Sequence, residues 1–129
     1  MHPSSFVIVA EGEAHPRREF ILSREASEWL MASRFWDRFN RVHGTGFGHY
    51  EEDLLPAGLV QQLRAALDVE LQRVEETAQP VLRFRYGWNE KKQELYCSVG
   101  GEELREELEA LRGFVREAER LQAGVHCRL

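Results

Sequence analysis

Residues 81–99 read VLRFRYGWNEKKQELYCSV, and this stretch decides the fold. Apolar and polar side chains alternate in both halves, which is typical of two β-strands that each bury one face. The apolar face of the first strand carries Leu82, Phe84, Tyr86 and Trp88. The outward face of the same strand carries Arg83 and Arg85. The stretch therefore predicts a β-hairpin with one core face and one polar face.

The same alternation predicts how the two strands pair. A tight turn centred on Glu90 and Lys91 would set Phe84 opposite Cys97, and apolar side chains would then face apolar side chains. A slip of one residue would set Phe84 against Tyr96 and mix the two faces. We therefore expect only the first register.

Outward from the hairpin, hydrophobic spacing predicts the remaining elements. We expect strands at residues 6–10 and 19–22, and amphipathic helices at residues 24–42, 56–77 and 102–123. Residues 51–55 are expected to form a short turn, and Gly124 to cap the last helix. These elements predict an α+β fold. A small, mainly antiparallel sheet, made of the N-terminal strand or strands and the 81–99 hairpin, packs against three amphipathic helices in a single globular domain, residues 1–129.

The composition of the chain limits the classes of protein to which it can belong. The chain has 129 residues, 43% of them hydrophobic and 30% charged, with a net charge of −5. This is typical of a globular protein, and the net charge argues against nucleic acid as the partner. The longest apolar run, residues 6–10, is too short to span a membrane, so we expect a cytoplasmic protein with no membrane partner. Basic residues are mostly Arg and acidic residues mostly Glu, which favours a bacterial origin.

The glycine-rich segment at residues 43–50 is the most site-like part of the sequence. Alternating glycines let backbone amides converge on an anion, and two imidazoles and a phenol would add polar groups. The candidate ligand-binding residues are His43, Gly44, Gly46, Gly48, His49 and Tyr50. The segment follows a helix and has no Lys, unlike known phosphate loops. A flexible connection between helices is the plainer explanation of the glycines.

Metal binding and covalent catalysis have little support. His43, His49 and residues 51–53 match no metal-ligand spacing, and there is no Gly-x-Ser-x-Gly motif. Cys97 falls on the core face of the hairpin, and Cys127 lies near the chain end, where we expect mobility. Both are expected as free thiols. We predict no metal, no cofactor and no catalytic residue.

Two surfaces are candidates for binding a partner. Arg83, Arg85 and Tyr96 share the outward face of the hairpin, beside Lys91 and Lys92 at its tip. This face suits a carboxylate-rich protein or a single-stranded nucleic acid, although a solvated face with an Arg85–Glu94 ion pair is the plainer interpretation.

The second surface lies on the last helix, where Arg112 and Arg116 belong to a basic stripe. Apolar residues recur along this helix at alternating intervals of four and three, as in helices that pack against each other between two subunits. We therefore predict a homodimer through this helix. Packing inside one copy explains the same spacing.

We therefore expect a small, acidic, non-enzymatic domain that binds another protein, as immunity proteins, antitoxins and secretion chaperones do. The alternative is a domain that binds a small ligand, anion or nucleotide through residues 43–50, with or without enzymatic activity. Binding of RNA through the hairpin is a third, weaker hypothesis because the chain is acidic.

Overall fold

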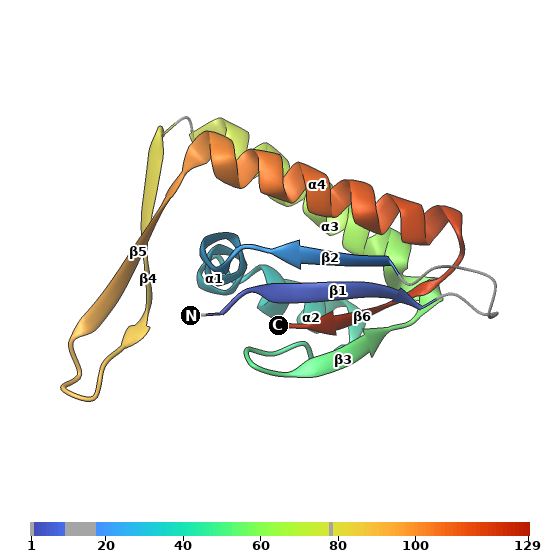
Figure 1. The fold of residues 1–129 in the computed structure, drawn as a ribbon, viewed down its shortest axis with the longest axis horizontal. Helices are drawn as coiled ribbons and strands as arrows, with labels where there is room; N and C mark the ends of the chain where they lie inside the picture. Colours follow the sequence, from blue (N-terminus) through green and yellow to red (C-terminus); the bar gives the residue numbers. More distant parts are fainter. Residues whose placement is uncertain (1, 10–17, 78) are drawn as a thin grey trace.

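The computed structural model describes residues 2–9, 18–77 and 79–129, and it confirms the α+β fold (Figure 1). A four-stranded antiparallel sheet has the order β2-β1-β6-β3. Its strands are β1 (Ser4–Val9), β2 (Arg18–Leu22), β3 (Glu52–Leu55) and β6 (Gly124–Arg128). The expected strand at residues 6–10 is β1, except that Ala10 lies outside the described residues.

Alternating burial gives this sheet one core face. Phe6 and Ile8 of β1 and Val125 and Cys127 of β6 are buried, whereas Val7 between them is only partly covered. Successive side chains of a strand point to opposite faces, so the buried residues share the face that meets the helices. Within the described residues, no helix covers the other face (Figure 1).

In the described part of the chain, four helices form the second layer of the fold: α1 (Arg24–Ala32), α2 (Phe35–His43), α3 (Ala57–Thr77) and α4 (Gly101–Arg120). The long helices α3 and α4 lie side by side (Figure 1). They run antiparallel, because Arg64 near the start of α3 pairs with Glu119 near the end of α4. The apolar stripe of α4 is fully buried in this contact and against the sheet: Leu104, Leu108, Leu111, Val115 and Ala118. No helix of the described chain is both long and apolar enough to span a membrane.

The helix expected at residues 24–42 is in fact two helices. Arg34 adopts a left-handed conformation with φ of 62°, which interrupts the helix between α1 and α2. The break lets α2 bury Trp36, whose ring lies 5.0 Å from that of Phe35 and 5.3 Å from that of Phe47. Burial of this aromatic cluster outweighs the cost of one left-handed residue, about 1–2 kcal/mol.

The hairpin consists of β4 (Val81–Trp88) and β5 (Glu94–Gly100), and the predicted register is confirmed. Phe84 lies opposite Cys97, and Leu82 lies opposite Val99. We expected the hairpin to form one sheet with the N-terminal strand or strands, but in the described residues it is a separate two-stranded sheet. Its core face packs on α1, where the rings of Phe84 and Trp29 meet edge to face at 5.6 Å. The turn end projects beyond the body of the molecule (Figure 1).

A β-bulge changes the outer half of the hairpin. The register shifts between Arg85 and Gly87, so Tyr86 is the extra residue. A bulge reverses the alternation beyond it. Trp88, which was expected on the core face, therefore lies on the outward face, with its ring 4.3 Å from the Arg85 guanidinium.

Two strands of the structure, β3 and β6, were not predicted from the sequence. The last helix ends at Arg120 instead of Ala123, and Gly124 begins β6 instead of capping the helix. The expected turn at residues 51–55 is largely the edge strand β3, which pairs with β6. The prediction of a mobile end around Cys127 was wrong, because β6 lies between β1 and β3.

Candidate functional site

The outward face of the hairpin forms one continuous surface of stacked side chains. The Arg83 guanidinium lies 3.9 Å from the centre of the Tyr96 ring, and that of Arg85 lies 4.3 Å from the centre of the Trp88 ring. Glu94 lies beside them and accepts hydrogen bonds from Tyr96 at 2.5 Å and from Arg85 at 3.2 Å. We call these five residues the hairpin outer face.

The exposure and the charge of the hairpin outer face favour the binding of another molecule. Trp88 is 57% exposed and Tyr96 is 43% exposed, although both are large aromatic residues. The hydrogen bond to Glu94 raises the pKa of Tyr96, and the same bond, followed by the Arg85 contact, lowers the pKa of Glu94. Tyr96 therefore stays neutral and Glu94 charged at neutral pH. Residues 81–100 carry four basic and two acidic side chains, so this segment is cationic in an acidic chain.

The two candidate partner-binding residues on α4 lie elsewhere. Arg112 Nη1 lies 3.1 Å from Asp68 Oδ1 of α3, and Arg116 lies 3.9 Å from the same oxygen. These arginines hold α3 and α4 together inside the chain. Because the apolar stripe of α4 is also buried, a dimer through this helix would have to use its polar side. Homodimerisation stays a prediction.

The glycine-rich segment is organised around one side chain, Asn40. Its Oδ1 accepts hydrogen bonds from the Phe47 amide at 2.9 Å and the Thr45 hydroxyl at 2.7 Å. Its Nδ2 donates to the Phe47 carbonyl at 2.7 Å. Gly44, with φ of 67°, ends α2 and donates its own amide to the Asn40 carbonyl. The amides of Gly44 and Phe47 are therefore used within the segment and do not converge on an anion.

The six candidate ligand-binding residues do not gather at one place. His43 ends α2, and its ring lies 4.6 Å from the ring of Phe39. His49 lies with Nε2 2.8 Å from Oε1 of Glu28 on α1, and its ring stacks on that of Tyr50 at 3.9 Å. Gly46 and Gly48 lie in the connection between them, and the Gly48 carbonyl accepts a hydrogen bond from the Glu51 amide. The two imidazoles thus contact different helices.

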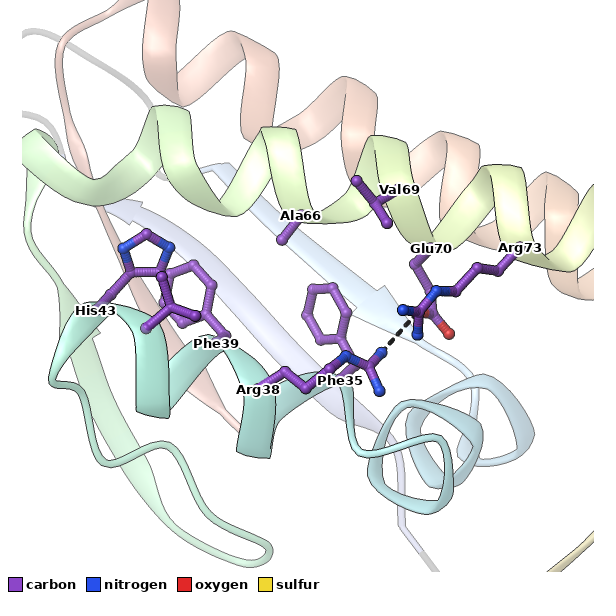
Figure 2. Close-up of a pocket in the computed structure, with 9 residues that line it drawn as sticks. Phe35, Arg38, Phe39, His43, Ala66, Val69, Glu70 and Arg73 are labelled. Carbon is purple, nitrogen blue, oxygen red and sulfur yellow. Dashed lines mark hydrogen bonds and ion pairs between the residues drawn. The ribbon is translucent and has the colours of Figure 1, made fainter.

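The structure has a pocket between α2 and α3 that was not predicted from the sequence. It has a volume of about 260 Å³ and includes only one of the candidate residues, His43 (Figure 2). Glu70 lies at its opposite end and is only 2% exposed. The signal was present, because Glu70 falls on the apolar stripe of α3 between Leu67 and Val74. A carboxylate at a core position is rare unless it is paired, and this often marks a site.

Neither thiol has the character of a nucleophile. Burial raises the pKa of Cys127 to about 12, and burial also raises that of Cys97. Both cysteines are free. Within the described ranges, no three His, Cys, Asp or Glu side chains are grouped so that they would hold a metal ion.

Comparison with protein families, with curated proteins and with solved structures finds no match for this chain.

Proposed function

We propose that this chain is a non-enzymatic domain that binds an acidic surface of another protein through the hairpin outer face. The observation that carries the proposal is the pair of exposed aromatic rings, Trp88 and Tyr96, each stacked against an arginine. Tryptophan, tyrosine and arginine are the residues that contribute most to binding energy in protein interfaces.

The contacts of the arginines favour a carboxylate-rich partner. Stacking on a ring holds each guanidinium in place and leaves several of its N–H groups available to a carboxylate. Little conformational entropy is then lost when the partner binds, which strengthens the complex. Glu94 within the same surface and the acidic remainder of the chain disfavour a phosphate backbone.

We place the chain, by the same proposal, among small bacterial cytoplasmic proteins that act by occupying a partner, as immunity proteins, antitoxins and secretion chaperones do. Binding such a partner requires no covalent or catalytic step. This agrees with the raised pKa values of Cys97 and Cys127, which keep both thiols protonated.

The test is a pull-down that compares the proteins captured by the wild-type chain with those captured by matched variants. Trp88→Ala and Tyr96→Ala remove the exposed rings, while Tyr50→Ala removes a ring outside the hairpin that is even more exposed. A protein enriched by wild type and by Tyr50→Ala, but not by the hairpin variants, is then purified and its Kd measured. We expect each hairpin variant to weaken binding about 30-fold, as for a hot spot worth about 2 kcal/mol.

Two outcomes would overturn the proposal. The first is a purified partner that binds the hairpin variants as tightly as it binds wild type. The second is a capture that disappears after nuclease treatment, because the partner would then be RNA. Circular dichroism of each variant confirms that the hairpin variants remain folded.

A further inference from the structure

We infer that the pocket between α2 and α3 is a binding site for a small carboxylic acid with an apolar body. This site is separate from the hairpin outer face and does not depend on the function proposed above. The inference rests on three features of the pocket: apolar walls, a cationic end, and a limited volume (Figure 2).

The walls of the pocket are apolar and incompletely covered. Phe35 and Phe39 of α2 and Ala66 of α3 line the pocket, and the ring of Phe35 points toward α3 (Figure 2). On the two rims, Val42 is 74% exposed and Val69 is 54% exposed, although both face the same groove. A ligand with an apolar body would remove this surface from water, which contributes roughly 25 cal/mol for each Å².

One end of the pocket carries an excess of positive charge. Arg38 and Arg73 lie there with Glu70, and His43 lies at the other end (Figure 2). Glu70 is buried and pairs with Arg38 Nη2 at 3.1 Å. Arg73 pairs with no acidic side chain among the described residues. Two guanidinium groups against one carboxylate leave one positive charge, which one ligand carboxylate would balance.

Arg38 is already held in place for such a ligand. Its Nη1 donates to the Ser33 carbonyl at 2.6 Å, and its Nη2 donates to Glu70. The side chain is still 40% exposed, so N–H groups remain accessible to a second acceptor. A guanidinium positioned in advance binds a carboxylate with little loss of side-chain freedom. Glu70 thus acts as a positioning residue for Arg38.

The volume restricts the ligand to small molecules. At about 260 Å³, the pocket lies just below the usual range of small-molecule sites, which begins at about 300 Å³. A nucleotide, with its larger size and several charges, fits neither the volume nor the single excess charge. An aromatic or short aliphatic monocarboxylate fits both.

The test titrates the purified protein with phenylacetate and hexanoate, and with their neutral amides, and follows backbone amide shifts by NMR. We expect saturable shifts in α2 and α3 with a Kd of about 1 mM or tighter for the acids. Arg73→Met keeps the length of the side chain but removes its charge, and should weaken binding about tenfold. Arg105→Met on α4 is the matched control and should change nothing.

A second pair of variants tests the cavity itself. Ala66→Leu fills the pocket and should abolish the shifts, whereas Ala65→Leu, on the exposed neighbouring position, should not. The inference is wrong if no probe gives saturable shifts up to about 10 mM. It is also wrong if the amides bind as tightly as the acids, or if Arg73→Met and Ala66→Leu bind like wild type. Binding of a Leu-rich helical peptide with one Glu, but of neither free acid, would assign the groove to a protein partner instead.

Discussion

The Arg38–Glu70 pair leads to a prediction that separates the contributions of its two members. Glu70 is 2% exposed, and Arg38 is its hydrogen-bond partner in the structure. Truncation of Arg38 to Ala leaves a buried carboxylate without its hydrogen-bonded counter-charge. Replacement of Glu70 by Met instead leaves a partly exposed arginine that water can solvate. We therefore expect the two single variants to differ strongly in stability.

The magnitude follows from burial. Loss of one partner from a buried ion pair costs about 3–5 kcal/mol. Because the Arg38 side chain is 40% exposed, water can approach Glu70 after truncation, which reduces this cost to roughly 2 kcal/mol. The lost hydrogen bond to Ser33 adds about 1 kcal/mol. Arg38→Ala should therefore lower the free energy of unfolding by about 3 kcal/mol, and Glu70→Met by less than about 1 kcal/mol.

The double variant Arg38→Ala/Glu70→Met should lose only about 1–2 kcal/mol, because a coupling energy of about 2 kcal/mol offsets part of the two single losses. Urea unfolding at pH 7, followed by fluorescence of the three tryptophans, measures all four proteins. The Arg38→Ala midpoint should fall by about 1–2 M. Arg105→Ala, which breaks an exposed pair with Glu109, serves as control and should cost under about 0.5 kcal/mol. A double variant as unstable as Arg38→Ala would refute this reasoning.

Three further predictions concern the glycine-rich segment, the thiols and an exposed ion-pair cluster. Gly44→Ala should lower the free energy of unfolding by about 1 kcal/mol, because φ at Gly44 is 67°. Gly46→Ala, where an added Cβ would meet no atom within 4 Å, should be neutral or slightly stabilising in the same urea titration. If Cys97 or Cys127 reacts rapidly with Ellman's reagent in the native protein at pH 8, our assignment of buried, high-pKa thiols is wrong; we expect both to react only after unfolding. The hydrogen bonds of Glu117 with Arg120, followed by Arg18, lower its pKa from 4.5 to about 2, so its contribution is present above pH 4.5 and is lost as the pH falls through about 2. Glu117→Gln should therefore lose less stability than wild type in thermal melts between pH 5 and 2, and equal losses would contradict the assignment.

The hairpin shows which structural features an alternating sequence pattern predicts and which it does not. The pairing of Phe84 with Cys97 was predicted correctly because any shift by one residue exposes the core face. The bulge at Tyr86 was not predicted, although Gly87 in a strand is a known cue for one. That single extra residue places Trp88 on the outward face, and so it determines one of the two arginine–ring stacks of the hairpin outer face.

Strands β3 and β6 were missed for a different reason. The four residues of β3 show no clear alternation, and they form a strand because β6 offers them a partner. β6 does alternate, with Val125 and Cys127 buried, but five residues after a glycine cap resemble a tail. Both strands depend on contacts between distant parts of the chain, which local pattern does not contain.

The candidate sites differ in the same way. The hairpin outer face follows from alternation within one short segment, so most of it was predictable. The directions of His43 and His49 depend on how Asn40 folds the segment between them. The α2–α3 pocket requires the break at Arg34 and the packing of two helices, which the sequence pattern does not predict. The one indication of it in the sequence was a charged residue, Glu70, at a core position of α3.

The position of β6 in the sheet has a consequence for biosynthesis. Ser5 of β1 pairs with Arg128 of β6, and β3 meets the sheet only through β6. A ribosome makes β6 after every other described element, so β3 has no neighbouring strand until β6 has been made. Contacts of such long sequence separation form slowly. A nascent chain stalled before residue 124 should therefore expose the unpaired sides of β1 and β3 and become a target for chaperones that bind unfolded polypeptides.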